Sequence, residues 1–347
     1  MSLVSRWAKS IIFICFILAE FLPVPFVYGS EESLTRLIVS LPGPYNISYL
    51  PLEIIPAIGA DRQEGTKVQF LYVGGGGQAI KNLQSRNSDF AVAGLPAQMS
   101  AIINGGQLVP LVAIDDTPLF VLMVRSQLAD KIHSVSDLRG KKIGVNTGSL
   151  SSKTTSQQLM ELLLRANGVR VEEVNFQPSG QDWEAQSTAI LSGSVDAIMG
   201  DEPFASRLLE DGKVFFLANL ADPVRTLTFP GSSFLHAVLS TRPDFIKEQP
   251  EKVATMMRIM RRTLAWVANH SPEDLVAVLN LDQPEDRRYF LDALRKYPHL
   301  YSPDGKFSRK QLHETEVFFK AAYSDNKAAA SMRLEEMFDP RWSDLRD

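Results

Sequence analysis

One pattern of strand, loop and helix occurs twice in this chain of 347 residues, and it restricts the possible fold more than any other feature. The first copy starts at the apolar run Leu37–Ser40, continues to Val68–Val73, and ends in the sequence SDFAVAG at residues 88–94. The second copy starts at Ile143–Val145 and ends in SVDAIMG at residues 194–200. Strands that alternate with helices form parallel βαβ units, so the sequence predicts an α/β protein with two open sheets and helices on both faces of each.

Polar and glycine-rich loops follow the predicted strands in both copies. Ligands of open α/β sheets bind beyond the carboxyl ends of the strands. If the two sheets face each other, the loops converge on one cleft. These loops are Pro44–Asn46, Gly74–Gln78, Gly94–Pro96, Asn146–Ser152, Ser179–Gln181 and Gly200–Pro203.

The start of the second copy shows how such a loop is built. Ser134 and Asp137 fit a capping box, and Gly140 ends that short turn. The serine-rich loop Asn146–Ser152 then precedes a helix, whose first N–H groups and positive dipole end face the loop. The serine hydroxyls of this loop either donate to a ligand or cap the helix.

The N-terminus has the layout of a secretory signal peptide. Arg6 and Lys9 precede the apolar run Ile11–Ala19, and a small residue, Gly29, predicts cleavage there, so residues 1–29 are expected to be removed. An uncleaved membrane anchor is the alternative. The single cysteine, Cys15, lies inside the apolar run, so the mature chain is expected to have no disulfide and no thiolate site.

Charge and motif content exclude several function classes. Loss of two basic residues and one acidic residue with the leader changes the formal net charge from −4 to −5, which argues against nucleic acid as a partner. The five histidines lack metal-ligand spacing and no GxSxG motif occurs, so we expect no zinc site, no hydrolase nucleophile and no cofactor.

Two apolar segments predict a hinge, one between the copies and one after the second copy. An apolar run at residues 118–124 is long enough to leave the first lobe as a strand, and Val214–Leu217 is expected to run back. Lobe 1 is therefore predicted over 30–123 and 220–347, and lobe 2 over 124–219. Closure of two lobes about such a hinge is a known way to enclose a ligand.

Other motifs have more than one interpretation. Gly74–Ala79 fits GxGxxA after a strand, but Asp89 begins the next strand instead of ending it, so a ligand loop or a structural turn is preferred over a dinucleotide site. Asp201 and Glu202 form an acidic pair suited to acid–base work, to ligand binding or to a latch between lobes. Three aromatic residues either stack on a ligand or pack: Tyr45, Trp183 and Phe229.

The order of several motifs resembles that of a known family. They are the leader, the Gly-rich loop, the phrase Ser136–Val145, the strand Val195–Ala197, Glu202-Pro203, and Leu239–Phe245. With these motifs the chain resembles extracytoplasmic substrate-binding proteins of ABC importers, in the group of sulfonate, taurine, nitrate and thiamine-precursor binders. The cysteine-rich motif of the pyrimidine-precursor branch is absent, and no basic residue in these loops marks an oxyanion site.

The resemblance implies a type II periplasmic-binding-protein fold with a two-strand hinge, and a monomer that works outside the cytoplasm. It implies capture of a small polar or anionic organic solute of the sulfonate, nitrate or pyrimidine-like class, and delivery to an ABC permease in the inner membrane, without catalysis. An enzyme on the same fold and a sensing partner of a membrane receptor are the alternatives. The implied ligand contacts are Pro44, Tyr45, Asn46, Gly76, Gly77, Gln78, Leu95, Thr117, Thr147, Gly148, Ser149, Ser151, Ser152, Gln181 and Glu202.

Overall fold

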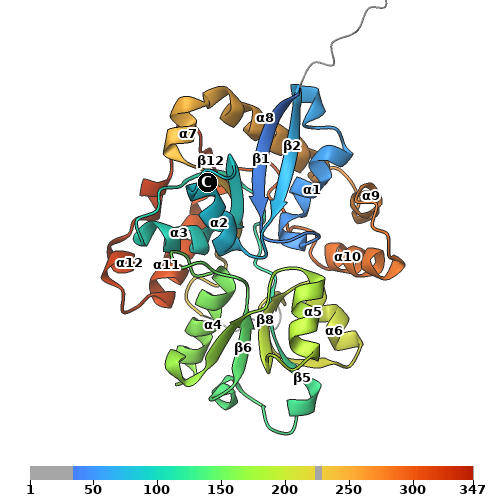
Figure 1. The fold of residues 1–347 in the computed structure, drawn as a ribbon, viewed down its shortest axis with the longest axis vertical. Coiled ribbons are helices and arrows are strands. Elements are labelled where there is room, and N and C mark those ends of the chain that lie inside the picture. Colours follow the sequence, from blue (N-terminus) through green and yellow to red (C-terminus); the bar gives the residue numbers. More distant parts are fainter. Residues whose placement is uncertain (1–33, 223–228, 347) are drawn as a thin grey trace, which may run out of the picture. The chain divides into compact units, whose positions relative to one another are not determined.

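The structure is a computed structural model that describes residues 34–222 and 229–346. The predicted signal peptide, residues 1–29, lies outside the described residues, as does any cleavage site. In the described part, two five-stranded sheets are flanked by helices, as the repeat in the sequence predicts (Figure 1). No helix of this part has the length and apolar character needed to cross a bilayer.

The first sheet contains three strands from the first copy, one strand that follows it, and one that returns from the second half of the chain. Its order is β2-β1-β3-β10-β4, and β1 runs parallel to β2 and β3, whereas β10 is antiparallel to both of its neighbours. The return of the chain to this sheet after His236 is therefore confirmed. The strands are β1 (Thr35–Leu41), β2 (Thr66–Tyr72), β3 (Phe90–Gly94), β4 (Val109–Ala113) and β10 (Ala237–Thr241).

The second sheet repeats this arrangement. Its order is β7-β6-β8-β5-β9, in which β6 is parallel to β7 and β8, and β5 is antiparallel to β8 and β9. The apolar segment from Val171 to Phe176 predicts a strand, and that strand begins only at Asn175, because Val171–Glu173 forms a 3-10 turn. The strands are β5 (Phe120–Arg125), β6 (Lys142–Val145), β7 (Asn175–Pro178), β8 (Ala197–Asp201) and β9 (Val214–Asn219).

The connections between the sheets lie outside the two strands expected to form them. β5 and β9 pair with each other inside the second sheet, because their apolar side chains belong to its cores. The chain therefore passes between the sheets over 114–119 and again after Asn219, a return that includes residues 223–228, which the structure does not describe. The boundary expected between residues 123 and 124 falls inside β5.

Helices cover both faces of each sheet. α1 and α8 pack on one face of the first sheet, and α2 and α3 pack on the other. α4 covers one face of the second sheet, and α5 and α6 cover the opposite face. The bounds are α1 (Leu50–Ala57), α2 (Gly76–Gln84), α3 (Leu95–Ile103), α4 (Thr155–Ala166), α5 (Trp183–Leu191), α6 (Phe204–Glu210), α7 (Pro243–Glu248) and α8 (Pro250–Ala268).

The C-terminal part is mainly helical, as expected. The sequence Ser271–Asp274 is typical of a helix start, and the structure confirms it, because the Ser271 hydroxyl accepts from the Asp274 N–H at 3.2 Å. The methionines of α8 are core residues, also as expected. The elements are α9 (Pro272–Val278), α10 (Pro284–Lys296), β11 (Phe307–Ser308), α11 (Arg309–Ala322), α12 (Lys327–Ser331) and β12 (Leu345–Arg346).

Candidate functional site

A small buried cavity, called here the central cavity, lies where the carboxyl ends of the two sheets meet. Its volume is about 10 Å³, which is room for about one water molecule. The two sheets are therefore closed on each other in this structure, and entry of an organic solute requires them to separate. The cavity is lined by Tyr49, Gly76, Gly94, Ala97, Phe120, Asn146, Thr154, Thr155, Gln181 and His236.

Three polar atoms of the lining residues have no hydrogen-bond partner. They are Asn146 Oδ1, Thr155 Oγ1 and Gln181 Oε1, all buried. An unpaired buried polar atom costs about 1–3 kcal/mol. Three of them around one cavity mark the place where a polar group of a ligand, or a water molecule, would pair with them.

A buried carboxylate, that of Asp201, lies near these lining residues. The Asp201 carboxylate accepts from Gln186 Nε2 at 2.7 Å, and burial raises the pKa of Asp201 to about 6. Hydrogen bonds from Gln186, Asn146 and Asn46, and the charge of His236, act in the opposite direction on this pKa. Acid–base work, ligand binding and a latch were the roles considered for Asp201; in this structure its carboxylate is buried and held by Gln186.

His236 reaches the cavity from the other side. Its Nδ1 lies 3.4 Å from Asp115 Oδ2, and both side chains are almost completely buried. The imidazole ring contacts Phe120 edge to face, with ring centroids 4.9 Å apart. Asp115 also accepts from the Thr117 N–H at 2.7 Å, so this carboxylate holds both the ring and the first connection between the sheets.

Three helices begin at the central cavity. α2 starts at Gly76, α3 starts after Gly94, and α4 is capped by Thr154, whose hydroxyl accepts from the Gln157 N–H at 3.3 Å. The first N–H groups of a helix have no partner within the helix, and its positive dipole end favours an acceptor or an anion. The cavity thus has an electropositive backbone side and an acceptor-rich side-chain side.

The loops expected to form the cleft touch each other directly. Gln78 Nε2 donates to Gly148 O at 2.8 Å, and Ser152 Oγ donates to Ala97 O at 2.7 Å. Glycine permits this approach, because a Cβ on Gly77 would lie 2.7 Å from the Gly148 Cα. The Gly-rich loop therefore packs against the second sheet at a distance that a larger residue would prevent.

The structure brings some of the predicted contact residues together and leaves others apart. Gly76 and Gln181 line the cavity, and Asn46 is next to it, with Nδ2 3.5 Å from Gln181 O. Those in contacts between the sheets are Gly77, Gln78, Thr147, Gly148 and Ser152. Leu95 donates its N–H to His236 O at 2.7 Å. Of the fifteen predicted contacts, only Gly76 and Gln181 belong to the cavity lining. The remaining predicted residues, also outside the lining, are Pro44, Tyr45, Thr117, Ser149, Ser151 and Glu202.

Several of these outlying residues have other partners. Tyr45 is 44% exposed and its N–H donates to Glu53. Glu202 accepts from the Ser206 hydroxyl at 2.9 Å. Of the other aromatic candidates, Trp183 packs on Phe204 and Arg207, and Phe229 packs on Phe318, so both have the packing role that was the alternative.

Other lining residues were not predicted. Asn146 and Thr155 lie at the two ends of the serine-rich loop, and their position after β6 and at the start of α4 is the signal that identifies them. Tyr49 and His236 carry a weaker signal, since each lies one residue from the end of a regular element. His236 was set aside for lack of metal-ligand spacing, and the described residues contain no group of three or more metal-binding side chains.

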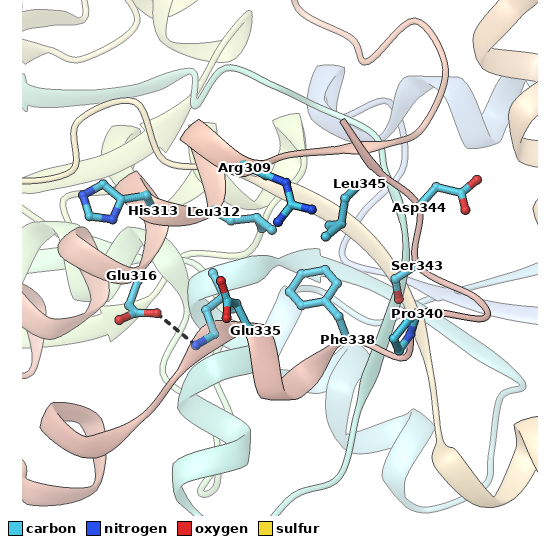
Figure 2. Close-up of a pocket in the computed structure, with 11 residues that line it drawn as sticks. Arg309, Leu312, His313, Glu316, Glu335, Phe338, Pro340, Ser343, Asp344 and Leu345 are labelled. Atoms are coloured by element: carbon cyan, nitrogen blue, oxygen red, sulfur yellow. Dashed lines mark hydrogen bonds between the residues drawn. The ribbon is translucent and has the colours of Figure 1, made fainter. Parts of the chain in front are cut away.

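A larger hollow lies on the C-terminal side of the fold and shares no residue with the central cavity. Figure 2 shows Leu312 and Phe338 facing it, with charged residues around them. Its volume is about 560 Å³, and Glu316 at its edge accepts from the Leu334 N–H at 3.0 Å. Among the described side chains, none that lines this hollow has an unpartnered buried polar atom. The central cavity is therefore the better candidate for a built site.

Comparison with known proteins agrees with this fold. The family model described as NMT1/THI5 like matches residues 62–274. The chain is 22% identical over 287 residues to YtlA of Bacillus subtilis (strain 168), named as a candidate binding protein, and the match covers 81% of each chain.

Two solved structures show the same architecture. The alkanesulfonate-binding protein SsuA from Xanthomonas axonopodis pv. citri, bound to MOPS, is 17% identical with a TM-score of 0.66, over 88% of this chain and 98% of that one. The periplasmic nitrate-binding protein NrtA from Synechocystis PCC 6803 is 11% identical with a TM-score of 0.64, over 89% of this chain and 87% of that one. The chain belongs to the NMT1/THI5-like family, and its fold is that of the periplasmic binding proteins of ABC importers.

Proposed function

We propose that this chain is an extracytoplasmic solute-binding protein that encloses a small polar or anionic organic solute in the central cavity and delivers it to an ABC permease. One observation carries the proposal. Three buried polar atoms, on Asn146, Thr155 and Gln181, face a cavity between two sheets and lack partners. A solute that pairs with them removes a cost that the closed protein otherwise bears.

Closure supplies the rest of the proposal. The hydrogen bonds from Gln78 to Gly148 and from Ser152 to Ala97 join the two sheets only when they are in contact. A solute shifts the protein toward this state only if it binds the closed state better than the open one. Groups from both sheets around the solute meet that requirement, and no chemical step is needed.

The cellular setting belongs to the same proposal. The proposed protein is a monomer with a cleaved signal peptide over residues 1–29, working in the periplasm or outside the cell. We place the first lobe over residues 30–119 and 220–347 and the second over 120–219, since β5 and β9 pair within the second sheet.

The test is solute capture by the mature protein. Native mass spectrometry of protein purified without denaturation is expected to show a bound small molecule, and that molecule is expected to raise the melting temperature when it is added back. Sulfonates, nitrate, amino acids and pyrimidines form the first screen. Failure to retain or bind any solute contradicts the proposal.

An enzyme on the same fold is the second candidate, and the raised pKa of Asp201 favours it. A buried carboxyl with a pKa of about 6 is suited to general acid–base work. The two functions differ in what happens to the bound compound. A binding protein releases it unchanged, and an enzyme releases a product, so mass analysis before and after incubation separates them.

A further inference from the structure

We infer that the solute carries an N–H or O–H donor together with an acceptor or anionic group, and that simple oxyanions such as nitrate or unsubstituted sulfonates are disfavoured. This inference rests on the proposed function. It follows from the distribution of donors and acceptors around the central cavity.

The orientation of the Asn146 amide is fixed by its neighbour. The Asn146 amide acts on the Asp201 carboxylate, which only accepts, so the amide nitrogen of Asn146 faces that carboxylate. The oxygen, Oδ1, is therefore the unpartnered atom, and the residue is 3% exposed. Only a donor satisfies this oxygen.

Gln181 adds a second acceptor on the same wall. Its Nε2 donates to the Tyr49 hydroxyl at 3.1 Å, which leaves Oε1 without a partner, and the residue is 1% exposed. The two amide oxygens therefore require N–H or O–H groups on the solute. An oxyanion has only acceptors and leaves both oxygens unpaired.

The charged groups near the cavity also disfavour a solute that has only acceptor atoms. Asp201 contacts the side chains of this wall and Asp115 holds His236, so two carboxylates lie behind the lining. No lysine or arginine is among the described residues that line the cavity. A bare anion in the cavity therefore meets no lysine or arginine side chain among these residues.

The backbone side of the cavity accepts the second group of the solute. The N-termini of α2 and α4 border it, and their N–H groups and dipoles favour a carboxylate, sulfonate or carbonyl oxygen. At the start of α3 the Leu95 N–H already donates to His236 O and Pro96 has no N–H. A molecule with a donor at one end and an acceptor at the other satisfies both walls. Amino acids, aminosulfonates and amides have this chemistry.

Calorimetry with matched solutes tests the inference. β-Alanine has both groups, propionate lacks the donor and propylamine lacks the acceptor; taurine and ethanesulfonate form a second pair. We expect the donor-bearing acid to bind about tenfold to a hundredfold tighter than its counterpart, the effect of leaving one buried acceptor unpaired. Equal or tighter binding of propionate, ethanesulfonate or nitrate overturns the inference and leaves the proposed function intact.

A second arm covers solutes larger than these probes. Immobilised protein is exposed to the low-mass fraction of yeast extract, and the retained compounds are released by denaturation and identified by mass spectrometry. Retained compounds with an N–H or O–H donor support the inference, and retained compounds without one overturn it. If neither the probes nor the extract yields a bound solute, the proposed function itself fails and this inference with it.

A pair of variants tests whether the Gln181 side chain causes the preference for solutes with a donor. Gln181→Met removes one of the two unpaired oxygens at nearly constant size and is expected to lower the affinity ratio of each matched pair, while Asn146 Oδ1 retains part of it. Gln177→Met, on the edge strand β7 and outside the cavity, is expected to keep the wild-type ratio. Circular dichroism of both variants confirms folding, and an unchanged ratio in Gln181→Met counts against the assignment.

Discussion

Asp115 and His236 are paired across the two segments that connect the sheets, with 3.4 Å between Oδ2 and Nδ1 and both residues almost fully buried. Asp115 precedes β5, and His236 precedes β10, so the pair joins the chain where it leaves the first sheet to the chain where it returns. The Asp115 N–H and the Ala237 carbonyl also lie within hydrogen-bond distance, at 3.4 Å. The pair therefore joins the two connecting segments to each other beside the central cavity.

The substitution Asp115→Ala is expected to lower the free energy of unfolding by about 3 kcal/mol. It leaves the Thr117 N–H and the His236 ring without their buried acceptor. Urea denaturation measures the change. The control Asp130→Ala removes an exposed aspartate and is expected to change stability by less than about 0.5 kcal/mol. Equal effects of the two variants would show that the buried pair has no structural role.

The Asp201 carboxyl makes stability depend on pH in a defined direction. Its pKa is raised from 3.8 to about 6, so the folded protein binds this proton more tightly than the unfolded chain does. This contribution is fully present below about pH 4 and is lost as the pH rises through about 6. Asp201→Asn cannot titrate at this position. We therefore expect its free energy of unfolding to rise relative to that of the wild type by up to about 3 kcal/mol as the pH increases over that range.

Urea denaturation of both proteins between pH 4 and pH 7 tests this expectation. Taking the difference between the two proteins removes the titration of other groups, such as Asp116 and Glu53, whose pKa values burial also raises. A difference that does not vary with pH would mean that the Asp201 carboxyl has an ordinary pKa in the folded protein.

Gly75→Ala is expected to hold the sheets apart without unfolding either one. The φ of Gly75 is 170°, a conformation open to any residue, but an added Cβ would overlap the Thr147 carbonyl oxygen of the other sheet. Small-angle scattering is expected to show a larger radius of gyration for the variant, with unchanged circular dichroism. Lys81→Ala, on the same helix, serves as the control and is expected to match the wild type.

Two serines of one loop form a matched pair for the latch between the sheets. Ser152 Oγ donates to Ala97 O at 2.7 Å, whereas the Ser149 hydroxyl lies 3.5 Å from the Ser151 hydroxyl on its own loop. Ser152→Ala is expected to weaken solute binding by about threefold to tenfold, because a bond present only in the closed state is lost. Ser149→Ala is expected to have a smaller effect. Titration of the solute found by native mass spectrometry compares them, and the reverse order would contradict the latch.

The repeat allowed much of the fold to be predicted from the sequence, because the periodicity of apolar residues and the residue types at turns are local properties. The strand Ile143–Val145, the strand within the sequence SVDAIMG, which begins at Ala197, the capping box at Ser134 and the helix after Ser271 depend on residues within a few positions of each other. Which of the two sheets a strand joins is not a local property of the sequence. β5 was expected to leave the first lobe, but its side chains fit the cores of the second sheet, and that choice depends on partners far along the chain.

The candidate site was predictable at the level of loops and less so at the level of atoms. The loops at Gly76 and Gln181 reach the central cavity because the carboxyl ends of parallel strands share one edge. The inward direction of Asn146 and His236 depends on Asp201 and Asp115, which are distant in sequence. Ser152 was expected to contact the solute and instead bonds across the closed cleft, a distance set by glycines in the facing loop.

Phe318 and Phe319 show how one helix joins the two halves of the fold. They are adjacent on α11, yet Phe318 belongs to the hydrophobic core of the second sheet and Phe319 to a separate hydrophobic core that contains Leu95 of α3 and Val238 of the first sheet. Both side chains are completely buried. The C-terminal helix therefore contacts both sheets, although the whole segment after residue 219 was expected in the first lobe.

Truncation of each ring is expected to have a local signature. Phe318→Ala and Phe319→Ala should each cost about 3–5 kcal/mol, as large-to-small changes at buried aromatic sites do. Hydrogen exchange is expected to show loss of protection in β6 and α4 for Phe318→Ala, and in β10 and α3 for Phe319→Ala, because each cavity opens in a different core. If both variants lose protection in the same strands, the two cores unfold as one unit, and α11 does not separate them.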